Sequence, residues 1–377
     1  MHHADSSPLG KIFMLLVLIA QSFCIPAEVF PQSDQEMGLG IALSQPLTVN
    51  WSYESDATTN LTPATDSDRI FFPLASGTLI SIRANNGQLI WKTELGGELS
   101  SSPTADESNV YVASEINNPR TTRHTNGVLR ALGREGGITL WMRTLPGSIQ
   151  GSLVTNDANL FGGSSDGRVY AIKKETGDIA WTMQHSAPFA SHPTLSGSRL
   201  YIGSNDGSLF SLDQTTGKVH WRYRTQGAIH GRAIVFSGIV YFGSDDGFVY
   251  AIGETDGRLR WRKRTGASVQ TVAYSQTGLI AVSLDNFVYC LSFSKGDGLW
   301  KRQLAGRLAT EPLIARDGAL LLPFSSPIGV VLDLHDGKQL NSLPIGKDND
   351  ITASPVVVGN LLFLTTRHGF LAFSRPK

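Results

Sequence analysis

The side chains of this chain that could carry out catalysis are few and scattered. Asp245 and Asp246 stand together as paired carboxylates would, but they belong to an Asp-Asp-Gly sequence, where aspartate stabilises a tight turn. No group of histidines and cysteines has metal-ligand spacing, and no Gly-x-Ser-x-Gly nucleophile motif occurs. These observations predict a protein that is not an enzyme and that uses no cofactor or metal.

The two cysteines give no sign of catalysis either. Cys24 ends an N-terminal apolar run and Cys290 lies in an apolar strand sequence, so we expect no structural disulfide between them. The bacterial lipoprotein pattern needs a small residue directly before the modified cysteine, and Phe23 occupies that position. The sequence therefore leaves the lipidation of Cys24 open.

One column of polar residues does indicate a site. Aligned on the repeat described below, the units begin with Thr62, Ser102, Ser152, His192, Arg232, Thr271, Glu311 and Ser354. If these positions line a central channel, His192 and Arg232 are neighbours, and His230 is close to both. One interpretation is a binding site for a small anion or a peptide, to which Glu311 also contributes. The other is a hydrated channel wall that needs polar residues for its own stability.

A second candidate site is the segment 115–127, EINNPRTTRHTNG, which lengthens one unit of the repeat. Arg120, Arg123 and His124 make this segment basic. Insertions in repeat arrays form loops on one face, often the face that binds partners. The segment is either a loop that contacts a partner or a solvated insertion of little cost.

A repeat of tryptophan and glycine positions all of these candidates. Its spacing is 40 residues, apart from one step of 50 and one of 39, and a further step ends at Asn341. The tryptophans are Trp51, Trp91, Trp141, Trp181, Trp221, Trp261 and Trp300, and the glycines four residues before the later members are Gly87, Gly137, Gly177, Gly217, Gly257, Gly296 and, before Asn341, Gly337. Every tryptophan of the chain lies on this one period.

Each unit contains four short strand signals separated by turns. In one unit these are 233–238, 239–244, 248–253 and 259–264, with Asp-Asp-Gly and Glu-Thr-Asp-Gly turns around the third. Four antiparallel strands in about 40 residues are typical of a β-propeller blade. The chain ends with three strands of an eighth unit, and the strand around Trp51 supplies the fourth. We therefore predict an all-β, eight-bladed propeller of four-stranded blades over 46–377, closed by an N-terminal outer strand.

The recurring residues have packing roles in this prediction. The glycine permits the turn between the third and fourth strands, and the tryptophan fills the gap between blades while its indole N–H bonds a backbone carbonyl of the adjacent unit. The fourth strands also carry basic runs, WRYRT, WRKRT and WKRQ. We interpret these charges as protection of sheet edges against association rather than as a nucleic-acid site.

The N-terminus and the overall charge indicate where the protein acts. Lys11 precedes the apolar run IFMLLVLIAQSFCI, which predicts a signal peptide over 1–27, followed by a linker over 28–45. Lysine plus arginine and aspartate plus glutamate both number 32, so the bulk charge makes neither nucleic acid nor an anionic membrane surface an expected partner. We expect a monomer that is exported across the inner membrane to the periplasm or cell envelope.

The units AIKKETGDIAW, SLDQTTGKVHW and AIGETDGRLRW resemble the tryptophan-docking repeats of propellers of the pyrroloquinoline-quinone type. That family includes quinoprotein dehydrogenases and a non-enzymatic branch that assists outer-membrane β-barrel assembly. The dehydrogenases have long inserts, often adjacent cysteines, and a calcium site; this chain has nearly minimal units and no adjacent cysteines.

The resemblance therefore implies a non-catalytic scaffold that binds another envelope or secreted protein, with peripheral membrane association. The alternative is a quinoprotein-like dehydrogenase or cofactor-binding protein. A third class, carbohydrate or matrix recognition, stays open through the glycosylation sequon Asn60-Leu61-Thr62.

Overall fold

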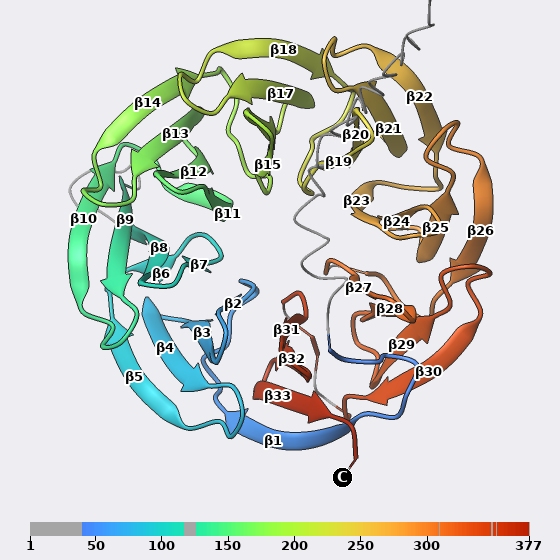
Figure 1. Cartoon of the computed structure of the whole chain (residues 1–377), viewed down its shortest axis with the longest axis horizontal. Helices are drawn as coiled ribbons and strands as arrows, with labels where there is room; N and C mark the ends of the chain where they lie inside the picture. Colours follow the sequence, from blue (N-terminus) through green and yellow to red (C-terminus); the bar gives the residue numbers. More distant parts are fainter. Residues whose placement is uncertain (1–39, 117–125, 309, 348–349, 352, 377) are drawn as a thin grey trace, which may run out of the picture.

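The computed structural model describes residues 40–116, 126–308, 310–347, 350–351 and 353–376. These residues form eight antiparallel sheets arranged as blades around a central axis (Figure 1). The eight-bladed, all-β propeller predicted from the repeat is confirmed. Among the described residues there is no helix of the length and apolarity needed to cross a membrane.

Blades 1 to 4 follow one another along the chain. Blade 1 contains β2 (Ala64–Thr65), β3 (Arg69–Leu74), β4 (Thr78–Arg83) and β5 (Leu89–Glu94). In blade 2 the innermost strand is split into β6 (Glu98–Leu99) and β7 (Thr104–Ala105), followed by β8 (Asn109–Ile116), β9 (Asn126–Gly133) and β10 (Thr139–Leu145). Blade 3 contains β11 (Ile149–Thr155), β12 (Asn159–Ser164), β13 (Arg168–Lys173) and β14 (Ile179–Gln184). Blade 4 contains β15 (Thr194–Ser196), β16 (Arg199–Gly203), β17 (Ser208–Asp213) and β18 (Val219–Arg224).

Blades 5 to 7 repeat this order, and blade 8 joins the two ends of the chain. Blade 5 contains β19 (Ile234–Phe236), β20 (Ile239–Gly243), β21 (Phe248–Gly253) and β22 (Leu259–Arg264). Blade 6 contains β23 (Val269–Tyr274), β24 (Leu279–Ser283), β25 (Phe287–Leu291) and β26 (Gly298–Gln303). Blade 7 contains β27 (Leu313–Ala315), β28 (Gly318–Leu321), β29 (Ile328–Leu332) and β30 (Gln339–Pro344). Blade 8 contains β31 (Val356–Val358), β32 (Leu361–Thr366), β33 (Gly369–Ser374) and β1 (Thr48–Glu54).

Each tryptophan docks on the glycine of the following blade, not on the glycine of its own unit. Trp181 of blade 3, for example, lies against Gly217 of blade 4, where a Cβ atom would be 2.4 Å from its ring, and φ at Gly217 is +71°. The indole N–H of Trp181 donates to the carbonyl of Gln214 at 2.9 Å. All seven tryptophans repeat this pair of contacts, so the predicted backbone acceptor in the adjacent unit is confirmed.

The eighth boundary, between blades 7 and 8, lacks a tryptophan for a topological reason. Strand β33 ends the chain and β1 begins the ring, so no turn joins the third and fourth strands of blade 8. At this boundary Asn341 of β30 donates through Nδ2 to the carbonyl oxygens of Leu43 (2.9 Å) and Gln45 (2.7 Å). The segment before β1 thus takes the place of the missing turn.

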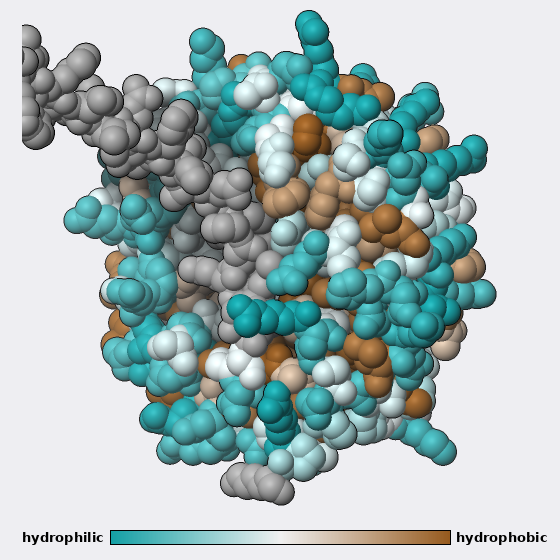
Figure 2. Space-filling view, turned by 45° about the vertical axis from the view of Figure 1, so that its right-hand side comes forward, coloured by the Kyte–Doolittle hydropathy of each residue, from teal (hydrophilic) through white to brown (hydrophobic). Residues whose placement is uncertain are grey.

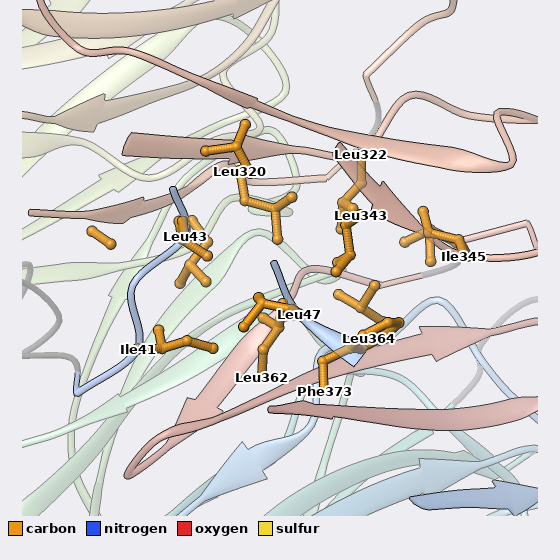
Figure 3. Close-up of a cluster of buried hydrophobic side chains, with 14 residues drawn as sticks. Ile41, Leu43, Leu47, Leu320, Leu322, Leu343, Ile345, Leu362, Leu364 and Phe373 are labelled. Atoms are coloured by element: carbon orange, nitrogen blue, oxygen red, sulfur yellow. The ribbon is translucent and has the colours of Figure 1, made fainter. Parts of the chain in front are cut away.

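Apolar side chains from three parts of the chain form the core of this closure. Ile41, Leu43 and Leu47 are buried among side chains of blades 7 and 8 (Figure 3). The Asp317 carboxylate accepts hydrogen bonds from the backbone N–H groups of Leu43 (3.1 Å) and Ser44 (2.8 Å). Within the linker predicted over 28–45, residues 40–45 are described, and they pack on the propeller rather than away from it.

Candidate functional site

The polar column lines the centre of the ring. All eight of its residues border one or both of two cavities of about 380 Å³ each. One cavity is lined by the residues that follow the column, such as Thr65 and Thr155, and the other by residues that precede it, such as Asn60 and Gln270. The column therefore stands between the two chambers of the central channel.

Three charged or titratable side chains of the column meet inside the channel. Arg232 of blade 5 donates through Nε to Oε1 of Glu311 at 3.1 Å, which links blade 5 to blade 7 past Thr271 of blade 6. His192 of blade 4 lies with Nδ1 3.9 Å from the same carboxylate oxygen. The predicted neighbourhood of His192 and Arg232 is thus real, and Glu311 is its centre.

Burial and the ion pair set the protonation states of this cluster. Burial in the channel lowers the pKa of His192 from its usual value, and the charge of Glu311 opposes that shift only in part. Burial alone would raise the pKa of Glu311, but the charge and hydrogen bond of Arg232, together with the charge that His192 gains at low pH, outweigh it, so that the pKa is lowered. At neutral pH the cluster therefore holds an Arg–Glu ion pair beside a neutral imidazole. The Nδ1 atom of that imidazole is buried and has no hydrogen-bond partner among the described residues.

The hydroxyl members of the column join neighbouring blades. Ser102 Oγ accepts from the backbone N–H of Thr62 at 3.0 Å, and Ser354 Oγ accepts from the backbone N–H of Glu311 at 3.0 Å. Ser102 and Ser152 also form a parallel bridge between blades 2 and 3. These contacts join the inner strands of neighbouring blades at the rim of the channel.

The remaining predicted residue of the channel, His230, points to a different partner. Its Nε2 lies 3.0 Å from Oδ2 of Asp245, whose other oxygen accepts a hydrogen bond from Ser268. The contact between His230 and His192 is through the backbone, where the N–H of His192 donates to the carbonyl of His230 at 3.4 Å. Asp246, by contrast, caps its own turn by accepting from the N–H of Phe248 at 3.1 Å.

Two other predictions fall partly or wholly outside the described residues. Arg120, Arg123 and His124 lie in 117–125, outside the described part of the chain, as does Cys24. Cys290 is buried, and burial raises the pKa of its thiol to about 11. Within the described ranges no three histidine, cysteine, aspartate or glutamate side chains are grouped to hold a metal ion.

A surface that the sequence analysis did not single out lies on the outer edge of blade 2. Strand β10 is at the end of its sheet, so its outward backbone groups have no partner strand among the described residues. Ile138, Leu140 and Met142 are 72%, 59% and 59% exposed along or beside this strand. At the positions of Ile138 and Met142 the other units have polar residues, such as Gln88 and Lys92 or Lys218 and Arg222, so alignment of the units on their tryptophans would have found this surface.

The fold and its repeated contacts define a class of protein: a propeller whose blades are joined by tryptophan docking, with a polar central channel and open outer strands. The chain belongs to the family described as "Outer membrane protein assembly factor BamB", which it matches over residues 42–123, 125–234 and 225–376. The resemblance seen in the repeat units is therefore confirmed.

Curated relatives share shorter regions with the chain. It is 31% identical over 121 residues to outer membrane protein assembly factor BamB of Shewanella oneidensis, which is 30% of this chain and 28% of that protein. It is 26% identical over 128 residues to BamB of Burkholderia pseudomallei, or 34% and 31% of the two chains. A 99-residue region is 31% identical to tetrathionate hydrolase of Acidithiobacillus ferrooxidans, 26% of this chain and 18% of that protein. The matched regions thus span about a third or less of these relatives.

Solved structures match the whole propeller. The crystal structure of BamB from Moraxella catarrhalis superposes with a TM-score of 0.73 and 19% identity, covering 88% of this chain and 98% of that one. Quinohemoprotein alcohol dehydrogenase from Comamonas testosteroni gives a TM-score of 0.71 and 12% identity over 88% and 77%. At these identities the likeness concerns the fold alone.

Proposed function

We propose that the protein is a non-catalytic scaffold of the cell envelope that contributes to outer-membrane protein assembly by binding other proteins. Membership of the assembly-factor family supports the process. The observation that carries the binding role is the apolar outer edge of blade 2, where Ile138, Leu140 and Met142 are exposed on an open strand. Monomeric proteins seldom leave a strand edge both unpaired and apolar unless another chain covers it.

The binding step in this proposal is strand addition. An extended segment of the partner aligns beside β10 and exchanges backbone hydrogen bonds with its outward N–H and C=O groups. Exposed Leu140 and Met142 then contact apolar side chains of that segment. Such a site selects chains with β-strand character and exposed apolar side chains, which is the chemistry of an outer-membrane β-barrel strand before it is paired.

We also propose the cellular arrangement that this role requires. Residues 1–27 direct export, 28–45 connect the signal to the ring, and the propeller over 46–377 acts as a monomer in the periplasm, with peripheral association to the membrane. The closure of the ring by β1 supports the monomer, because every blade is completed within one chain.

For the channel, we propose that His192, Arg232 and Glu311, with His230 at one chamber, form a subsite for a carboxylate or other small anion, such as a peptide terminus. On binding, the guanidinium of Arg232 would release the carboxylate of Glu311 and donate its hydrogen bond to the anion instead. The buried Nδ1 of His192 offers the anion a further polar contact. Isothermal titration with acetate and with a short peptide tests this subsite. Loss of binding in Arg232→Gln supports the subsite, and equal binding by the wild type and this variant contradicts it.

A second candidate function is that of a quinoprotein-like enzyme. The observation that favours it is the superposition with a quinohemoprotein alcohol dehydrogenase, together with the region shared with tetrathionate hydrolase. Incubation of the purified protein with pyrroloquinoline quinone and calcium separates the two candidates. Tight quinone binding with dye-linked alcohol oxidation would establish the enzyme and overturn the scaffold.

The scaffold proposal is tested in a Gram-negative strain that lacks its own assembly factor of this family. Expression of the full chain is expected to restore the amount of folded β-barrel proteins in the outer membrane. A correctly exported chain that leaves those amounts unchanged contradicts the proposal.

A further inference from the structure

We infer that the outer rim of blades 4, 5 and 6 binds the anionic surface of a phospholipid bilayer. This surface consists of the outer strands β18, β22 and β26 and is called the basic rim below. The three strands contain eight lysine or arginine residues and no aspartate or glutamate. The inference goes beyond the proposed binding of proteins at blade 2, since it concerns a different part of the ring.

The centre of the basic rim carries four cations outside any ion pair among the described residues, and the nearest described carboxylate to Arg262, that of Asp246, accepts a hydrogen bond from the hydroxyl of Tyr250 at 2.7 Å. Arg262, Lys263, Arg264 and Lys301 are all exposed, and none of them forms an ion pair with a described carboxylate. The guanidinium of Arg262 lies 4.8 Å from the ring centre of Phe248, and Nζ of Lys301 lies 3.7 Å from that of Phe287. These aromatic faces hold the cations in place without neutralising them.

The other cations of the basic rim are paired with carboxylates or hydrogen-bonded to the backbone. Arg222 pairs with Asp206 at 3.0 Å, and Arg260 pairs with Asp256 at 2.9 Å. Arg302 donates to the carbonyl of Gly337 at 2.7 Å and thus serves the boundary with blade 7. The unneutralised charge is therefore concentrated on blades 5 and 6.

The other outer strands do not share this character. In β5, Lys92 pairs with Glu94 at 3.2 Å, while β14 and β30 contain no charged residue. Edge protection needs only scattered charges of either sign, so it does not account for charges of one sign on consecutive blades. The chain as a whole has a net charge of zero, and eight of its 32 lysine and arginine residues lie on these three strands.

The neighbours and shape of the basic rim favour lipid over an acidic protein. Val219, Leu259 and Leu299 are 40%, 42% and 50% exposed on the same three strands. Basic side chains at the level of lipid phosphates with aliphatic side chains beside them are typical of interfacial membrane binding. The rim is convex and rich in hydrophilic side chains where it comes forward in Figure 2. A deformable headgroup layer can follow such a surface, whereas a rigid globular partner would touch it over a small area.

Flotation of the full chain with vesicles tests the inference. We expect binding to vesicles that contain phosphatidylglycerol, little binding to pure phosphatidylcholine, and loss of the difference in high salt. The comparison of the two lipids removes any contribution of the apolar N-terminal run. The variant Arg262→Gln/Lys263→Gln/Arg264→Gln should bind roughly 100-fold more weakly, since each basic residue near an anionic surface contributes about fivefold.

A matched variant controls for net charge. Lys92→Gln/Lys173→Gln/Lys338→Gln removes three exposed charges from blades 1, 3 and 7 and should bind phosphatidylglycerol as the wild type does. Equal binding by both variants, or equal binding to both lipids, overturns the inference. The inference is also overturned if the wild-type protein does not bind vesicles but is retained on immobilised polyglutamate, because the basic rim would then be a protein-binding surface.

Discussion

Asn341 and Leu43 are 298 residues apart in the chain, and the side-chain amide of the first donates a 2.9 Å hydrogen bond to the carbonyl of the second. This contact lies at the one blade boundary that has no tryptophan. It shows that the loss of tryptophan at Asn341 is part of the closure of the ring, because the segment before β1 occupies the space that a docking turn fills elsewhere.

The first prediction concerns this closure. Asn341→Ala removes the hydrogen bonds to Leu43 and Gln45, and we expect a loss of about 1–3 kcal/mol in the free energy of unfolding in urea. Limited proteolysis should also cut the segment 40–47 sooner in this variant. The control is Asn205→Ala, on an exposed turn, which should change neither result. A variant as stable as the wild type would mean that the closure does not depend on Asn341.

The second prediction separates docking from backbone strain. Gly217→Ala places a Cβ 2.4 Å from the ring of Trp181 at a φ of +71°, and it should destabilise the protein by about 2–4 kcal/mol. Gly197 has a φ of +53° with no atom within 4 Å of its Cβ position, so Gly197→Ala should cost only about 1 kcal/mol for the backbone. Equal losses of free energy in chemical denaturation would refute the docking role.

The third prediction concerns pH. Because burial lowers the pKa of His192 in the folded protein, the unfolded chain takes up a proton first as the pH falls below about 6.5. The free energy of unfolding should therefore decrease on acidification from pH 7 to pH 5, by up to about 1.4 kcal/mol for each unit of the pKa difference. In His192→Gln this part of the decrease is absent. Parallel pH profiles of the melting temperature in both proteins would show that His192 does not titrate in this way.

The blade number was predictable because every boundary but one requires a tryptophan, and a large aromatic residue at a fixed spacing is visible in the sequence. The role of Asn341 was not predictable, since its partners come from the opposite end of the chain. The polar column was also visible, but the pairing of Arg232 with Glu311 spans two blade boundaries. That pairing depends on the width of the channel, which no local pattern encodes. The apolar edge at Leu140 was also visible in the sequence, because a comparison of the outer strands of all units would have revealed it.

The proposed partner site has a matched control built into the repeat. Leu140 and Met142 of blade 2 correspond to Ala180 and Thr182 of blade 3, which flank Trp181 in the same way and are also exposed. Replacement of either pair of residues by two lysines adds the same charge to an outer strand. Only the first pair should disturb a partner strand, because two charges would be brought against its apolar side chains.

The measurement that tests the scaffold proposal most directly is the amount of folded β-barrel protein in the outer membrane of a Gram-negative strain that lacks its own assembly factor. We predict that the wild-type chain and Ala180→Lys/Thr182→Lys restore this amount, while Leu140→Lys/Met142→Lys reaches the same level of folded propeller and does not restore it. Equal restoration by both variants would contradict the assignment of the partner site to the edge of blade 2.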